Sequence, residues 1–184
     1  MMLYTDDVKT MLGGVTDAQV ESTFAAAIAS STEALTNSEI NAEFSLVFVG
    51  PLPYTETSID SEIVIVKLRQ NEAVAQLRAC TGADLVQLVG RFDDVCGRAY
   101  LFGGIAEWGF SVVGANCFYI FAHTHEFGHN LGCYHNRENT NQIHEYAYGW
   151  RYCDGTDPQP WRASNQPQRT PRPADPRLVW WMLA

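Results

Sequence analysis

One short segment, residues 124–135, constrains this chain more than any other. It reads Thr-His-Glu-Phe-Gly-His-Asn-Leu-Gly-Cys-Tyr-His and so has the pattern H-E-x-x-H-x-x-G-x-x-H. On a helix, His125 and His129 are four residues apart and lie on one face, one turn above the other. Gly132 can adopt a left-handed conformation and end the helix, so that the chain turns back and brings His135 to the same place. The segment therefore predicts three imidazoles that converge from a helix and the turn after it.

Three neutral imidazoles with one open position are the ligand set of a catalytic zinc ion, whereas structural zinc is closed by four protein ligands. Glu126 lies about 100° round the helix from His125, next to the predicted metal, where it can act as a general base towards water. The alternative is an amphipathic core helix that happens to carry histidines. Five fixed positions at fixed spacing favour the metal site, because packing explains three histidines and a glutamate poorly. We therefore predict His125, His129 and His135 as zinc ligands.

The same segment resembles the zinc-binding motif of the metzincin zinc endopeptidases. The surrounding sequence resembles their reprolysin-like (adamalysin-like) branch at residues 82–86, 96–101 and 110–113 and at Cys117. Within that branch the similarity is to secreted microbial enzymes, including the peptidyl-Asp metalloendopeptidase type, and it runs from about Leu3 to about Arg162. The resemblance implies zinc-dependent cleavage of an internal peptide bond, with the three histidines as ligands and Glu126 as catalytic base.

The resemblance also implies an α/β fold. In that fold a twisted, mostly parallel sheet with an antiparallel edge strand packs on helices, including the zinc-binding helix. The edge strand beside the cleft is expected at residues 100–102, and the residues expected to bind substrate are Tyr100, Leu101, Phe102 and Gly103. An unpaired edge exposes backbone N–H and C=O groups, to which an extended peptide can add as a further strand. On the residues alone, an ordinary edge strand that binds no substrate is an equally good interpretation.

Hydrophobic periodicity predicts the other elements. Residues 17–36 are expected to form a helix that begins with a capping box of Thr16 and Gln19. Residues 61–80 are expected to form a second helix, although residues 63–66 also fit a short strand. Strands are expected at residues 42–49, 84–89, 100–102 and 110–113, and the zinc-binding helix at residues 117–131.

Two histidines lie outside the motif pattern. His123 forms an H-x-H pair with His125, but on a helix these two side chains point about 200° apart and cannot easily share a metal. His123 is therefore expected to be a packing or surface residue. His144 lies in a segment that is expected to be a loop, and it is expected at the surface.

The C-terminal part departs from the family pattern. Metzincins have a methionine-containing turn after the third histidine, usually a small residue, x, Met, x and Tyr, which forms an apolar floor under the zinc. That turn should begin near Trp161 and Arg162, but the chain continues Ala-Ser-Asn-Gln, and Met182 lacks the flanking residues. We therefore expect a catalytic domain over residues 1–155 with an incomplete C-terminal subdomain, followed by a disordered Pro/Arg-rich tail over residues 156–184. A frameshift in the coding sequence near Arg162 is a sharper hypothesis for the same departure.

The chain has five cysteines, so at least one has no partner within it. The resemblance implies a disulfide between Cys96 and Cys117 that holds the segment before the zinc-binding helix. Two alternatives remain for Cys133 and Cys153: they pair with each other, or Cys153 has lost its partner. Cys80 has no expected partner. A set of free buried thiols is a further interpretation, and a thiolate zinc site is not expected, because no C-x-x-C pattern occurs.

Composition limits the partners and the location. The 184 residues fit one domain, and the net charge of −9 argues against nucleic acid or an anionic membrane as a partner. No apolar run reaches the roughly 18 residues of a membrane span. The first residues lack the basic end and apolar segment of a signal peptide, whereas the resemblance implies a secreted enzyme. We therefore hypothesise that the sequence is a fragment of a longer precursor.

Three functions remain from the sequence. The first is an active zinc endopeptidase that acts on peptide or protein substrates. The second is a domain that binds zinc but is inactive and serves at most as a peptide-binding module, because the methionine turn is missing. The third is a structural domain without zinc.

Overall fold

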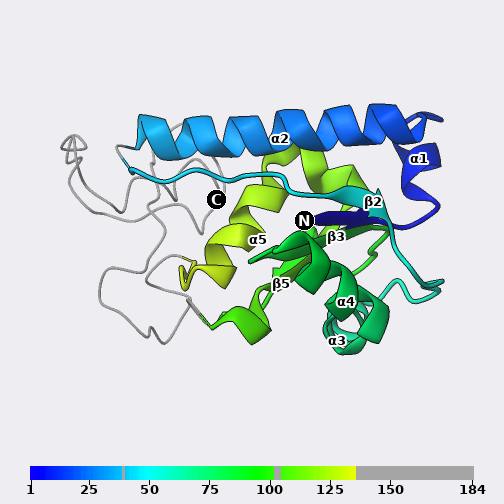
Figure 1. The fold of residues 1–184 in the computed structure, drawn as a ribbon. Helices are drawn as coiled ribbons and strands as arrows, with labels where there is room; N and C mark the ends of the chain where they lie inside the picture. Colours follow the sequence, from blue (N-terminus) through cyan, green and yellow to red (C-terminus); the bar gives the residue numbers. More distant parts are fainter. Residues whose placement is uncertain (39, 102–104, 136–184) are drawn as a thin grey trace, which may run out of the picture.

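A five-stranded sheet forms the centre of the fold in the computed structural model, which describes residues 1–38, 40–101 and 105–135 (Figure 1). Its strands are β1 (Met2–Tyr4), β2 (Val49–Pro51), β3 (Val86–Gly90), β4 (Gly97–Ala99) and β5 (Phe110–Gly114). The strand order is β2-β1-β3-β5-β4. Neighbouring strands are parallel except for β4, which is antiparallel to β5. The expected mostly parallel sheet with an antiparallel edge strand is therefore confirmed.

Helices cover both faces of this sheet (Figure 1). The α-helices are α1 (Val8–Met11), α2 (Asp17–Asn37), α3 (Ser61–Gln70), α4 (Glu72–Thr81) and α5 (Ala122–Asn130), and the short 3-10 helices are η1 (Ala106–Trp108) and η2 (Ala115–Ile120). The long helix α2 and helix α5 lie on one face, whereas α3 and α4 lie on the other. None of the helices in the described part of the chain is long and apolar enough to span a membrane.

The side chains of the central strands alternate between the two faces of the sheet, and this produces one hydrophobic core on each face. Successive side chains of a strand point to opposite faces. On β3, Val89 packs in the core on the side of α2 and α5, whereas Leu88 packs in the core on the side of α3 and α4. On β5, Val113 and Val112 divide in the same way. The central strands are therefore apolar on both faces, as is typical of parallel sheets between helices.

Helix α2 matches its expected range closely. The Thr16 side chain accepts a hydrogen bond from the backbone N–H of Gln19, and the Gln19 side chain accepts one from the backbone of Thr16. The predicted capping box is therefore present, and the helix runs one residue beyond the predicted end.

The predictions for residues 42–49 and 61–80 gave the wrong bounds. The strand expected at residues 42–49 is confined to β2, because the backbone of Phe44 bonds to the side chain of Thr32 on α2 instead of to a neighbouring strand. The single helix expected at residues 61–80 is two helices. Asn71 leaves the helical conformation, with φ −77° and ψ 122°, and its side chain caps the first turn of α4.

The elements next to the motif also differ from their expected bounds. The edge strand is β4, three residues before the range expected at residues 100–102, although Tyr100 still donates its N–H to Phe110. The zinc-binding helix begins at Ala122 instead of residue 117, because Phe121 adopts a left-handed conformation with φ 62° after the 3-10 helix η2. Strand β3 begins at Val86, two residues later than expected.

Several predictions fall outside the described residues. These are the roles of Phe102, Gly103, His144 and Cys153, the position of the methionine turn, and the tail over residues 156–184. The division into a domain over residues 1–155 and a tail therefore stays a prediction.

Candidate active site

Helix α5 carries most of the motif, and buried polar contacts fix it between the sheet and α2. Gln87 on β3 donates from Nε2 to the carbonyl oxygen of His123 and to the hydroxyl of Ser111, each at 3.0 Å. The two ring nitrogens of His123 lie 3.2 Å from the carbonyl oxygen of Ala27, on α2, and 3.3 Å from that of Phe118, so the N–H of its neutral imidazole can donate to one of them. His123 is thus buried as a packing residue, and burial lowers the pKa of its imidazole. The first turn of α5 is consequently held from both sides.

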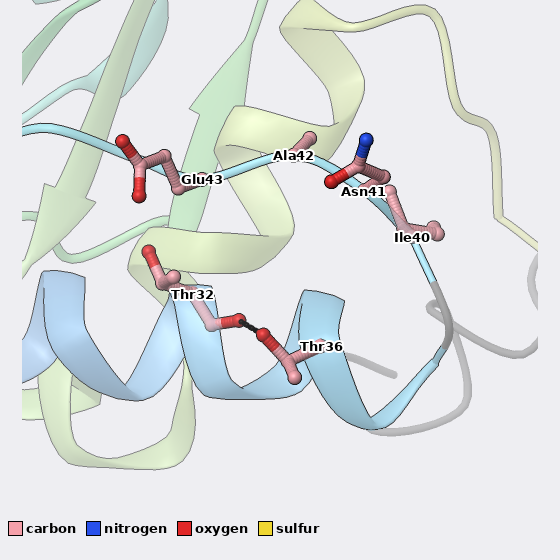
Figure 2. Close-up of a pocket in the computed structure, with 6 residues that line it drawn as sticks. All are labelled: Thr32, Thr36, Ile40, Asn41, Ala42 and Glu43. Atoms are coloured by element: carbon pink, nitrogen blue, oxygen red, sulfur yellow. Dashed lines mark hydrogen bonds between the residues drawn. The ribbon is translucent and has the colours of Figure 1, made fainter.

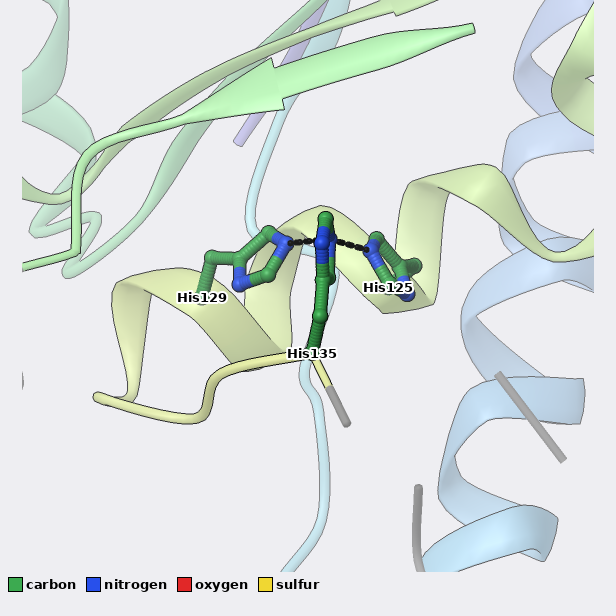
Figure 3. Close-up of side chains that lie close together, drawn as sticks. All are labelled: His125, His129 and His135. Carbon is green, nitrogen blue, oxygen red and sulfur yellow. Dashed lines mark hydrogen bonds between the residues drawn. The ribbon is translucent and has the colours of Figure 1, made fainter. Parts of the chain in front are cut away.

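The three motif histidines converge at the other end of α5 (Figure 3). Nε2 of His135 lies between the other two rings, 3.0 Å from Nε2 of His125 and 3.0 Å from Nε2 of His129. Gly132 has a φ of 92°, so it makes the left-handed turn that returns the chain to the helix, as expected. One ligand atom from each histidine lies within 4.8 Å of the others.

The geometry of this cluster fits a zinc ion. Four-coordinate zinc with Zn–N bonds of about 2.0–2.1 Å places its nitrogen ligands roughly 3.3 Å apart, close to the two observed separations of 3.0 Å. Nδ1 of His129 lies 2.7 Å from the carbonyl oxygen of Cys133. A proton on Nδ1 then leaves a lone pair on Nε2, which faces the other rings, and this is a common arrangement behind metal-binding imidazoles.

The electrostatic environment of His129 also favours its neutral, metal-binding form. Burial, with a smaller contribution from the charge of His125, lowers the pKa of His129 to about 3. Its imidazole, which is 7% exposed, is therefore neutral across the ordinary pH range. A neutral imidazole is the form that coordinates a metal ion.

Glu126 lies beside the cluster and is packed under the edge strand. Its side chain is 4% exposed and contacts Gly97 of β4 so closely that a Cβ atom on Gly97 would lie 2.7 Å from Cγ and 2.8 Å from Cδ of Glu126. Burial raises the pKa of Glu126 to about 8, and the positive charge of Arg98 acts in the opposite direction. Oε2 is buried and has no hydrogen-bond partner among the described residues. This oxygen can therefore accept a hydrogen bond from a small molecule at the site.

A disulfide connects the start of the edge strand to the 3-10 helix η2, which precedes α5. Cys96, directly before β4, is joined to Cys117 in η2, with Cα atoms 5.4 Å apart, as the family resemblance implied. Cys80 is exposed and outside any disulfide in the described part of the chain. Cys133 follows the C-terminal end of α5, and Cys153 lies outside the described residues, so the two alternatives for this pair stay predictions.

The residues expected to bind substrate lie at the end of β4. Tyr100 packs edge-on against Trp108 with ring centres 4.9 Å apart, and Leu101 packs against Tyr134. Sequence reasoning missed Asn130, whose Nδ2 donates to the carbonyl oxygens of Tyr100 and Phe110, both at 3.0 Å.

The missed residues had only weak signals in the sequence. Asn130 stands at a variable position of the motif, and Gly97 lies in one of the segments that carried the family resemblance. Their neighbours across the fold depend on how the sheet packs against α5, which residue spacing does not reveal.

Two hollows lie away from the histidines. One of about 510 Å³ is formed by Thr32 and Thr36 of α2 and by residues 40–43 (Figure 2). The other, of about 520 Å³, lies between α2, α5 and the start of β3. Neither is lined by a motif histidine or by Glu126, so the candidate active site is separate from both.

Comparisons with known proteins point to one family. The family profile described as metallopeptidase family M12B, reprolysin-like, matches residues 22–136. No curated protein sequence matches the chain. Among solved structures, a chain from a structure titled "Structure of a chaperone-substrate complex" is similar, with a TM-score of 0.66 and 26% identity over 82% of this chain. The match covers 25% of that longer chain. Because the profile matches more than half of the sequence and includes all three motif histidines, the chain belongs to the reprolysin-like metallopeptidases of family M12B.

Proposed function

We propose that this chain is a zinc endopeptidase that cleaves internal bonds of extended peptide segments. The observation that carries the proposal is the convergence of three Nε2 atoms from α5 and the turn after it, together with Glu126 of the same helix, whose buried carboxyl group packs against the antiparallel edge strand β4. His125, His129 and His135 would hold the ion. Zinc supplies Lewis acidity, which makes water more acidic, polarises a peptide carbonyl and favours the ionised form of a neighbouring carboxyl group.

Glu126 is proposed as the general base. Its carboxylate takes a proton from the attacking water and later passes that proton to the nitrogen of the leaving amine. Its low exposure supports this role, because a carboxylate shielded from solvent is a stronger base than an exposed one. Gly97 holds the carboxylate from above, and Arg98 contributes positive charge that favours the ionised form.

Strand β4 is proposed to bind the substrate backbone. β5 is its only neighbour among the described strands, so its other edge presents peptide N–H and C=O groups. An extended peptide can pair with that edge as a sixth strand and cross the site in front of the three histidines. Tyr100 and Leu101 would border the same cleft, because they continue β4 beyond Ala99.

Secretion and the choice of cleavage site are finer parts of the proposal. The Cys96–Cys117 disulfide supports folding in an oxidising compartment, because such bonds are rare in reducing cytosol. A preference for bonds beside aspartate, as in the peptidyl-Asp type, rests on the family resemblance alone.

The test compares wild-type protein with Glu126→Gln on a denatured protein substrate, with zinc measured by elemental analysis. We expect turnover to fall roughly 10²–10⁴-fold, while the zinc content stays near one equivalent. Glu107→Gln, which changes an exposed carboxylate of η1, serves as the matched control and should retain full turnover. A Glu126→Gln protein that hydrolyses at the wild-type rate would contradict the proposed base.

The second candidate is a zinc-binding domain without activity. The absence of the family's methionine-turn pattern from the sequence favours it. One equivalent of zinc together with no turnover in the wild type would select this function. His135→Ala, which removes one proposed ligand, should weaken zinc binding under either candidate.

A further inference from the structure

The amide of Asn130 joins the end of the zinc-binding helix to the edge strand. We infer that Asn130 is a positioning residue that fixes β4 relative to α5, and so sets the gap available to an extended peptide that pairs with β4. The substrate part of this inference rests on the proposed function, whereas the positioning of the strand does not.

The contacts of Asn130 connect three elements. It is the last residue of α5, directly after His129, and is 5% exposed. Its Nδ2 donates at 3.0 Å to the carbonyl oxygen of Tyr100, which follows β4, and at 3.0 Å to that of Phe110, which begins β5. Tyr100 N–H donates to the same Phe110 carbonyl. One amide thus binds the chain at the C-terminal end of β4 and at the N-terminal end of β5, which we call the hairpin end.

This position requires an amide donor. The third oxygen near Nδ2 is also a backbone carbonyl, that of Trp108 at 3.4 Å. Backbone carbonyls only accept hydrogen bonds, so the NH₂ group of Asn130 must face them. An aspartate of the same shape would turn a negative oxygen towards these carbonyls, and a leucine would leave the Tyr100 carbonyl without the donor from α5.

The opposite side of the same hairpin end is held by Arg69 of α3. Its guanidinium carbon lies 4.2 Å from the ring centre of Trp108 and 5.6 Å from that of Tyr100, both within cation–π range. The hairpin end is therefore held between Asn130 on one face and Arg69 on the other. Because Gly97 of the same strand contacts Glu126, a shift of this end changes the gap in which a peptide would bind.

Gln87 offers a matched control. Its buried amide also ties α5 to the sheet, but it does so at the first turn of α5, through His123, and it contacts β3 and β5 instead of β4. Loss of either amide should lower the stability of the protein, whereas only loss of the Asn130 amide should increase local opening of the edge strand β4.

The experiment uses Asn130→Leu and Gln87→Met in the full chain, with and without zinc. Hydrogen exchange of the backbone amides of residues 97–100 should speed up about tenfold or more in Asn130→Leu and much less in Gln87→Met. With zinc bound, KM should rise about tenfold for a peptide long enough to pair with β4. It should change little for a short peptide that contacts only the residues beside the scissile bond.

The outcomes separate the inference from the proposed function. If the wild type cleaves no peptide, the proposed function fails, and hydrogen exchange alone decides the role of Asn130. Equal acceleration across α5 and β4 in both variants would reduce Asn130 to a structural residue and overturn the inference. If Asn130→Leu does not fold, Arg69→Met releases the same hairpin end from the other face and must give the same local exchange, or the inference fails.

Discussion

Gly97 is the residue that determines how closely the edge strand approaches Glu126. The carboxyl group occupies the space that a side chain at position 97 would need. We expect Gly97→Val to displace the carboxyl group or to lift β4, and therefore to lower kcat at least tenfold, as for other small misplacements of a reacting group. Zinc content should stay at the wild-type level, because Gly97 has no side chain that could serve as a ligand. A variant with unchanged kcat would show that the contact is unimportant for turnover.

The residues of the site differ in how well the sequence predicts them. Helical spacing and the turn at Gly132 were enough to bring His125, His129 and His135 to one place, because all three lie within one helix and the turn after it. Gly97 and Asn130 could not be found in this way. Their contacts join α5 to β4, and the register between a helix and a strand depends on how their side chains pack, which spacing along one element does not contain.

The candidate site depends on the relative position of strand β4 and helix α5. The Cys96–Cys117 disulfide joins the residue before β4 to the 3-10 helix before α5. We expect the double variant Cys96→Ser/Cys117→Ser to lose about 2–4 kcal/mol in free energy of unfolding, as is typical when a loop of this size is opened. Urea denaturation measures this loss. Cys80→Ser changes an exposed thiol and should alter stability by less than about 0.5 kcal/mol.

The start of α5 illustrates why element boundaries are hard to predict. The apolar residues from Cys117 to Phe121 continue the helical pattern of the motif, so periodicity favoured a single helix. In the structure Phe121 is left-handed, and residues Ala115–Ile120 form a 3-10 helix instead. The disulfide fixes Cys117 beside β4, and a continuous helix would have to carry that residue elsewhere.

At the scale of the whole molecule, the sequence predicted the type of sheet better than its edges. Strands were expected at residues 84–89 and 110–113, and β3 and β5 lie there and are buried along their length. The segment over residues 42–48 was misleading because Phe44 and Leu46 pack in the core beside α2 and α5, as Phe44 does on Phe127, although strand pairing begins only at Val49. Burial and strand pairing produce the same alternating pattern, so the pattern alone cannot separate them.

Removal of the metal should affect the stability of the whole molecule. A ligand at 100 times its Kd stabilises the folded state by about 2.7 kcal/mol, which corresponds to a rise in Tm of roughly 5–10 °C for a chain of this size. A zinc chelator should therefore lower the Tm of the wild type by that amount and leave His125→Ala unchanged. An identical Tm with and without chelator would argue against a bound metal ion.

The three histidines are close together in the sequence, and this has a consequence for folding. The sheet pairs Met2 with Gln87, residues far apart in the sequence, whereas the ligands lie within residues 125–135. Long-range pairing of this kind forms slowly, but a short segment with three imidazoles can bind zinc while the chain is still unfolded. Metal bound to the denatured ensemble lowers the stabilisation gained on folding. Refolding with zinc present from the start should therefore differ in rate from refolding with zinc added afterwards.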